Sequence, residues 1–231
     1  MRLIADRGFG GMYPENTVRA VEESVALADA IAVDVRRCGS GELVVCRDET
    51  VDRVSDGSGR VAELSVADLS MLDVLGTGEG IPRIEAVLEA VPRSVGAMLR
   101  LREGDLAADA IAAAEAFPVQ TVVASAYPGE LAAARTADPD VPRAFSFGEE
   151  ADPLDALSTA VGVDAAFLLA PAEACTERLV NEAHRKRMRG AAGARALSGG
   201  VPGTGTRTAR RHARRSNRRD LCVRVTLIRP L

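Results

Sequence analysis

The sequence lacks tryptophan, has 3% aromatic residues, and contains only two histidines in 231 residues. Because aromatic residues are so few, the core must be built mainly from Val, Leu, Ile and Ala. Both histidines, His184 and His212, lie in the last quarter of the chain, so no segment before residue 184 can supply an imidazole for proton transfer. No run of about 18 apolar residues occurs, which predicts that the chain has no membrane-spanning helix.

Sequence patterns typical of disulfide-bonded and exported proteins are also missing. The four cysteines, Cys38, Cys46, Cys175 and Cys222, show no CxxC spacing, and a domain of this size does not need disulfides, so we expect free thiols. The N-terminus enters a predicted strand without the basic region and apolar segment of a secretory signal. We therefore expect a cytoplasmic location.

Lysine is nearly absent, and charge is divided unevenly along the chain. Residues 1–183 hold 15 Arg against 32 Asp and Glu, a balance of −17, whereas residues 184–231 hold 13 Arg and Lys186 against Asp220 alone, a balance of +13. Together these give the net charge of −4. An acidic body of this kind is typical of a protein kept soluble by self-repulsion, as in halophiles, although a GC-rich genome would also replace Lys with Arg.

Strand-like and helix-like segments alternate through the first 189 residues. The predicted strands are Leu3–Ala5, Ala30–Arg36, Val95–Leu101, Thr121–Ala126, Ala144–Phe147 and Ala165–Ala170. The predicted helices between and after them are Glu15–Ala28, Pro82–Val91, Leu106–Phe117, Gly129–Ala137, Leu154–Val161 and Pro171–Met188. This alternation favours a parallel sheet with helices outside it. We predict an α/β fold, a TIM-type (β/α)8 barrel that is incomplete because the last one or two β/α units are missing.

Two segments interrupt the alternation. The Gly39–Gly41 turn predicts a hairpin with the segment Glu42–Arg47, and residues 48–80 are polar and predict an irregular excursion over one face. Residues 190–231 form a basic tail rich in Arg and Gly without apolar periodicity, and we expect it to be disordered; only Leu221–Ile228 has a strand pattern. The tail is either a basic arm that binds nucleic acid or another polyanion, or the product of a GC-rich gene read out of frame.

The stretch from Leu3 to Thr17 has the pattern of a functional site. An apolar triplet is followed by Asp6 and Arg7 and then by a glycine-rich turn. In an α/β barrel the functional groups stand at the C-terminal ends of the strands, so this charged pair is a site candidate. The alternative is a surface ion pair beside a flexible loop.

Several segments in order carry a family resemblance: ADRGFGGMYPENT, AIAVDVRR, ELVVCRDETVDRVSDGSG, LSVADLSMLD and IPRIEAVLEA. From residue 1 to about 189 the chain resembles the glycerophosphodiester phosphodiesterase family. The resemblance implies a (β/α)8 barrel that hydrolyses glycerophosphodiesters to sn-glycerol 3-phosphate and an alcohol. In that family two histidines act as general acid and base, three carboxylates hold Mg²⁺ or Ca²⁺, and Arg and Lys hold the phosphate.

This chain departs from the family pattern at four demanding positions. Asp6 and Arg47 stand where the two histidines are expected, and Arg100 stands where a metal-binding glutamate is expected. Ala32 replaces another metal-binding glutamate, which leaves Asp34 as the one metal ligand carried over. An arginine is protonated at any usable pH, so it replaces neither a proton-shuttling histidine nor a metal-binding carboxylate.

The resemblance still implies a set of site residues. It places Asp6, Arg7 and Arg47 at catalytic positions. Substrate-binding candidates are Arg7, Glu15, Asn16, Arg102 and Tyr127. Residues 14–17 can equally be the turn and cap that start the first helix, and Tyr127 is as well suited to packing as to lining a pocket.

Two functional hypotheses follow, and both expect a small phosphodiester ligand. In the first, the protein descends from phosphodiesterases but is catalytically impaired, with Mg²⁺ or Ca²⁺ binding weak or absent. In the alternative it is a metal-free pseudoenzyme that binds phosphate or another anion, in which Asp6 pairs with Arg47 and Asp34 with Arg100. The mouth of that pseudoenzyme would be cationic and lined by Arg7, Arg47, Arg100 and Arg102. A third hypothesis is polyanion binding through the tail, which would be the protein's only route to nucleic acid.

Overall fold

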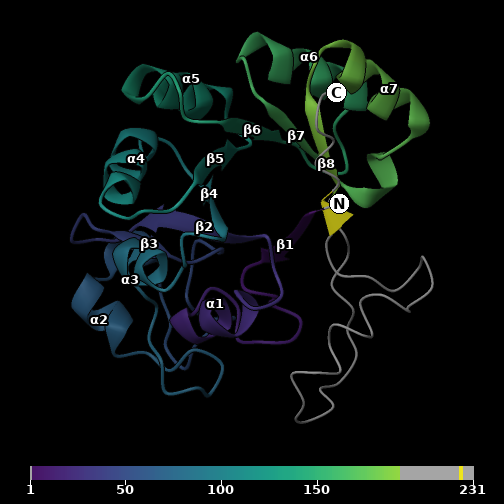
Figure 1. The fold of residues 1–231 in the computed structure, drawn as a ribbon. Helices are drawn as coiled ribbons and strands as arrows, with labels where there is room; N and C mark the ends of the chain where they lie inside the picture. Colours follow the sequence, from purple (N-terminus) through teal and green to yellow (C-terminus); the bar gives the residue numbers. More distant parts are fainter. Residues whose placement is uncertain (1, 193–223, 226–231) are drawn as a thin grey trace.

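The computed structural model describes residues 2–192 and 224–225. A curved sheet forms the centre, and the helices lie outside it (Figure 1). The sheet order is β8-β7-β6-β5-β4-β2-β1-β9, with β3 paired to β2. Its strands are β1 (Arg2–Asp6), β2 (Ala30–Arg37), β3 (Leu43–Val45), β4 (Gly96–Leu101), β5 (Thr121–Ser125), β6 (Arg143–Ser146), β7 (Phe167–Ala170), β8 (Arg189–Ala192) and β9 (Arg224–Val225).

The helices follow the strands in the predicted order. They are α1 (Val18–Ser24), α2 (Val66–Ser70), α3 (Ile84–Glu89), α4 (Ala107–Glu115), α5 (Pro128–Ala137), α6 (Pro153–Gly162) and α7 (Glu177–Arg185), with 3₁₀ turns η1 (Val61–Glu63) and η2 (Ala172–Ala174). The predicted single helix Pro171–Met188 is wrong over residues 171–176, which hold only the 3₁₀ turn η2. Thr176 caps α7 through its side chain, so the helix starts at Glu177. No helix within the described residues is long and apolar enough to cross a membrane.

The prediction of an incomplete (β/α)8 barrel is confirmed. In the described part of the chain β1, β2 and β4 to β8 are parallel, which makes seven barrel strands, and the outer edge of β1 pairs only with the antiparallel β9. The predicted hairpin of β2 and β3 is also present. Strand β8 was not predicted, because its sequence RGAA lacks the β-branched and aromatic residues that mark strands. The domain boundary at residue 189 stays a prediction, and the tail lies almost entirely outside the described residues.

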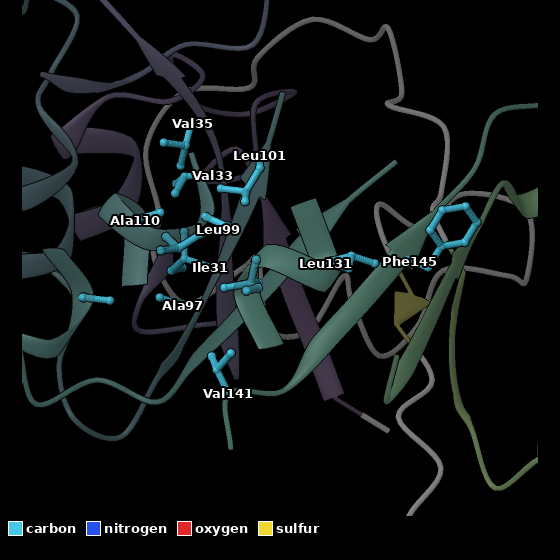
Figure 2. Packing of buried hydrophobic residues seen from close by; sticks show 14 of the residues in the cluster. Ile31, Val33, Val35, Ala97, Leu99, Leu101, Ala110, Leu131, Val141 and Phe145 are labelled. Carbon is cyan, nitrogen blue, oxygen red and sulfur yellow. The ribbon is translucent and has the colours of Figure 1, made fainter. Parts of the chain in front are cut away.

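Alternation along β2 and β4 separates the apolar core from the inner face of the sheet. On the outer face, Ile31, Val33 and Val35 pack with Ala97, Leu99 and Leu101 and with helix residues including Ala110 of α4 (Figure 2). On the inner face a smaller cluster contains only strand residues: Ile4, Ala32, Met98, Ala124, Ala144 and Phe167. On β1, β2 and β4 the next inward positions, one pleat closer to the C-terminal ends of the strands, are the charged residues Asp6, Asp34 and Arg100.

The predicted irregular excursion is confirmed and has its own small core. Residues 48–80 carry η1 and α2, and their buried side chains pack with Cys38, Val44 and Cys46 in a separate cluster. The thiols of Cys38, Cys46 and Cys175 are free, as predicted, whereas Cys222 lies outside the described residues. The excursion therefore packs against the β2–β3 hairpin at one side of the sheet.

Candidate functional site

Charged side chains gather at the C-terminal ends of β1, β2 and β4. We call this group the charged mouth, and it comprises Asp6, Arg7, Glu15, Asp34, Arg47, Asp48, Arg53, Arg100 and Arg102. Its centre follows from strand register, because Asp34 of β2 lies directly opposite Arg100 of β4. Asp6 ends β1 on the other side of β2. The candidate site therefore stands where the sequence predicted it.

Asp34 is the most enclosed charge in the mouth, with none of its surface exposed. Its Oδ1 lies 2.9 Å from Arg100 Nε and accepts a 2.7 Å hydrogen bond from Arg102 Nε. Its Oδ2 accepts hydrogen bonds from Arg100 Nη2 at 3.0 Å and from Asn16 Nδ2 at 3.3 Å. Burial raises the pKa of this carboxyl, but Arg100 and Arg102 outweigh that effect and hold the pKa below its usual range. The predicted Asp34–Arg100 pair is confirmed.

The predicted Asp6–Arg47 pair is wrong. Asp6 Oδ1 lies 2.5 Å from Arg100 Nη2, so Arg100 takes the role expected of Arg47. Arg100 projects from the inner face of β4 and reaches across β2, whereas Arg47 follows β3, which pairs with β2 outside the main sheet path. Arg47 is exposed, and no ion pair is found for its side chain among the described residues. Burial lowers the pKa of the Arg102 guanidinium, and the nearby positive charges of Arg100 and Arg47 lower it further.

Glu15 is buried between two guanidinium groups. Arg7 Nη1 donates to Glu15 Oε2 at 2.6 Å, and Arg53 Nη2 donates to Oε1 at 2.6 Å. Arg53 in turn contacts Asp48 at 2.5 Å. Since both Glu15 oxygens are engaged, this residue fixes the positions of Arg7 and Arg53.

The turn after β1 has an unusual backbone conformation, which sets the directions of the Arg7 and Asn16 side chains. Arg7, Phe9 and Asn16 all have φ between 52° and 60°, a left-handed conformation that is uncommon outside glycine and asparagine. Gly8 has φ 68°, and a Cβ there would lie 2.7 Å from the Ala20 side chain. The turn therefore requires glycine at this position and directs Asn16 back onto Asp34.

Sequence reasoning missed Arg53. It lies in the irregular excursion, within the segment ELVVCRDETVDRVSDGSG that carries the resemblance, but neither periodicity nor the resemblance assigned it a role. Tyr127 follows β5 at the start of α5 and is 51% exposed, so it is not packed in the core. Its backbone N–H donates to the buried Ser125 hydroxyl at 3.1 Å.

The residues present do not fit a divalent metal ion. Mg²⁺ and Ca²⁺ bind carboxylate oxygens, and the described residues contain no group of three potential metal-ligating side chains. Both oxygens of Asp34 already accept from or contact nitrogen donors. Arg100 brings a positive charge within 2.9 Å of one of them, and a metal ion would have to displace it.

The predicted cationic mouth is nearly neutral in the structure. Five guanidinium groups face four carboxylates, a balance of +1. Arg7, Arg100 and Arg102 are all ion-paired, although each guanidinium carries five N–H groups and therefore keeps donors to spare. Arg47 alone of the predicted four lacks an ion pair among the described residues.

The fold and the site define an α/β-barrel protein with its functional groups at the C-terminal ends of parallel strands. The profile of the glycerophosphoryl diester phosphodiesterase family matches residues 7–192, and the chain belongs to this family.

Individual relatives match shorter stretches. The protein YhdW of Bacillus subtilis is 37% identical over 109 residues, which are 44% of this chain and 45% of that protein. The glycerophosphodiester phosphodiesterase of Caldanaerobacter subterraneus is 38% identical over 96 residues, covering 38% of this chain and 40% of that protein. These matches span less than half the length of either relative.

Solved structures share the fold over most of the chain. A phosphodiesterase of Oleispira antarctica, in complex with the product sn-glycerol-3-phosphate, has a TM-score of 0.75 at 21% identity and covers 84% of this chain and 85% of its own. The glycerophosphodiester phosphodiesterase of Thermotoga maritima has a TM-score of 0.65 at 19% identity, covering 93% of this chain and 91% of its own. At these identities the likeness shows the fold.

Proposed function

We propose that this family member is impaired in the metal-assisted hydrolysis of glycerophosphodiesters to sn-glycerol 3-phosphate and an alcohol. The observation that carries the proposal is the engagement of Asp34, whose two oxygens are held by Arg100, Arg102 and Asn16. A cation that charges the phosphoryl group for attack needs those oxygens.

Proton transfer supports the same proposal. The positions where the resemblance expects histidines hold Asp6 and Arg47. Asp6 is ion-paired with Arg100, and a guanidinium such as that of Arg47 does not act as a proton shuttle. His184, the one histidine within the described residues, lies on the outer helix α7. The charged mouth, as defined by its described residues, therefore contains no imidazole to accept and then donate a proton.

The test is an assay of glycerophosphodiester hydrolysis in the presence of Mg²⁺ or Ca²⁺. The measured quantity is the amount of sn-glycerol 3-phosphate released. We expect the natural chain to be inactive or far slower than a variant combining Asp6→His, Ala32→Glu, Arg47→His and Arg100→Glu. Circular dichroism would establish that the variant is folded. Metal-dependent turnover by the natural chain, abolished by a chelator, would refute the proposal.

A second candidate function is metal-free binding of a small phosphate ester at the charged mouth. Arg47 is exposed and forms no ion pair in the described part of the chain. Arg7 and Arg102 lie within the same mouth and retain free N–H groups. Guanidinium groups bind phosphate oxygens by paired hydrogen bonds, so no metal is needed.

Titration calorimetry with sn-glycerol 3-phosphate and with a glycerophosphodiester tests this second candidate. Arg47→Gln should weaken binding roughly tenfold, the loss expected for one charge-assisted hydrogen bond. Arg93→Gln is the matched control, because Arg93 is also exposed but precedes β4 at the opposite end of the strands. Equal affinity of both variants, or no binding by the natural chain at millimolar ligand, would exclude this function. The cytoplasmic location and a polyanion-binding tail stay predictions.

A further inference from the structure

We propose that Arg36 is a positioning residue of the charged mouth, which fixes the backbone of Arg47 by a hydrogen bond and is itself held by Glu103. The proposal rests on the second candidate function, in which Arg47 and Arg102 bind phosphate oxygens without a metal ion. Neither Arg36 nor Glu103 belongs to the charged mouth, and neither needs to touch the ligand for this role.

Arg36 is a buried cation between two loops. It lies two positions after Asp34 on β2, so its side chain starts on the same inner face of the sheet. Its Nε donates to the Arg47 carbonyl oxygen at 3.1 Å, and its Nη1 donates to Glu103 Oε2 at 2.7 Å. A buried guanidinium needs a compensating charge, and Glu103 supplies it. Arg36 thus connects the loop after β3 to the loop after β4.

Glu103 anchors this connection at the end of β2. Its Oε1 accepts a hydrogen bond from the Arg37 backbone N–H at 2.8 Å, so both of its oxygens hold β2 residues. Glu103 follows Arg102 directly in the chain, and the Arg102 N–H donates to the Val35 carbonyl oxygen at 3.1 Å. The backbone segments that carry Arg47 and Arg102 are therefore both tied to the same strand.

The tie matters because no ion pair holds the Arg47 side chain within the described residues. Burial is the main cause of the lowered pKa of Arg102, and the positive charge of Arg47 contributes to it, so the two cations lie within electrostatic reach of each other. Like charges repel, and a fixed backbone opposes their separation. It keeps both guanidinium groups ready for one anion, and preorganisation of this kind raises affinity by lowering the entropy cost of binding.

The first test separates the charge of Glu103 from its positioning effect. Glu103→Gln removes a negative charge beside the mouth, which by long-range electrostatics alone would strengthen the binding of an anion. If Glu103 acts by holding Arg36, the same change weakens binding. We expect titration calorimetry with sn-glycerol 3-phosphate to show an affinity about threefold lower for Glu103→Gln and about tenfold lower for Arg36→Met, the loss of one charge-assisted hydrogen bond.

A double-mutant cycle tests whether Arg36 acts through Arg47. In the Arg47→Gln background, Arg36→Met should change the affinity by less than about twofold, because the residue that it positions is gone. A merely structural or electrostatic role would weaken binding equally in both backgrounds. The matched control is Arg37→Met, which removes a neighbouring cation that pairs with the exposed Asp109 and should leave the affinity unchanged.

A third measurement needs no ligand. Trypsin cleaves after arginine, and the peptide bond after Arg47 contains the carbonyl group that Arg36 holds. Cleavage after Arg47 should be about tenfold faster in Arg36→Met than in the natural chain, because losing the hydrogen bond favours local opening. Cleavage after the exposed Arg93 should keep its rate, which would exclude general unfolding.

The outcomes distinguish this proposal from the function on which it rests. No binding of sn-glycerol 3-phosphate by the natural chain at millimolar concentration would remove the second candidate function and this role of Arg36 together. Binding that Glu103→Gln strengthens, or that Arg36→Met weakens equally in both backgrounds, would overturn the positioning role alone. An unchanged ratio of cleavage after Arg47 to cleavage after Arg93 would also overturn it. If Arg36→Met does not fold, the direction of the Glu103→Gln effect decides.

Discussion

Asp34→Asn is the sharpest test of the ion pairs that Asp34 forms with Arg100 and Arg102. Asparagine has nearly the same shape as aspartate, so the change removes the charge and leaves the packing. The Arg100 and Arg102 side chains are only 20% and 32% exposed. In this variant Arg100 keeps the carboxylate of Asp6, whereas Arg102 loses its ion pair. Breaking a buried pair by removing one partner costs about 3–5 kcal/mol. Because the two arginines are partly solvated, we expect about 3 kcal/mol at neutral pH.

Urea denaturation at several pH values measures this loss. The folded-state pKa of Asp34 lies below its unfolded value, so its contribution to stability is fully present above about pH 4 and is lost as the pH falls through the folded-state pKa. The stability difference between the natural chain and Asp34→Asn should therefore be largest near neutral pH and should shrink in acid, where aspartate also becomes uncharged.

The matched control is Asp109→Asn, at an exposed pair with Arg37. Surface pairs contribute about 0–1 kcal/mol, so this variant should stay close to the natural chain. A loss below about 1 kcal/mol for Asp34→Asn at neutral pH, with an unchanged denaturant slope, would refute the reasoning that buried charge compensation stabilises the strand ends.

Three further predictions concern positions near the mouth or its supports. Glu130→Ala should cost about 1–3 kcal/mol by urea denaturation, because the buried Glu130 carboxylate accepts three backbone N–H groups at the start of α4; an unchanged midpoint would contradict this. Gly8→Ala should destabilise by more than about 1 kcal/mol, whereas Gly76→Ala should cost less, because both have positive φ but only Gly8 has close neighbours. Thermal unfolding compares the two glycine variants, and equal losses would count against the crowding argument. Burial raises the pKa of the Cys46 thiol to about 11, so alkylation of Cys46 in the folded protein should be slow at neutral pH and fast in urea, as peptide mass spectrometry would show; rapid alkylation without urea would contradict burial.

The fold was largely predictable because its signals are local. Apolar alternation in Ala30–Arg36 and Val95–Leu101 marks strands, and these two segments became neighbouring strands with the register that puts Asp34 opposite Arg100. The resemblance added that the parallel sheet curves as part of a (β/α)8 barrel. Strand β8 was missed because four residues of RGAA carry no strand pattern.

The site was predictable in position but not in pairing. Asp6 and Arg7 do lie at a strand end, as the sequence indicated. The choice of Arg100 over Arg47 as the partner of Asp6 depends on the reach of a long side chain across an intervening strand, which no pattern encodes. Arg53 was missed for a similar reason, because its partner Glu15 lies 38 positions away along the chain.

The direct opposition of Asp34 and Arg100 constrains the evolutionary routes open to this protein. Replacing Arg100 alone by glutamate would leave Asp6 without Arg100 and add a carboxylate beside Asp34, and replacing Asp34 alone would leave Arg102 without its carboxylate. Either single step is unfavourable, and because the two residues are in contact, the effect of changing one depends on which residue stands at the other position. A lineage that acquired this arginine would not easily revert by single substitutions. The Asp34–Arg100 ion pair therefore makes the two positions depend on each other, so that a change at one is unfavourable unless the other changes too.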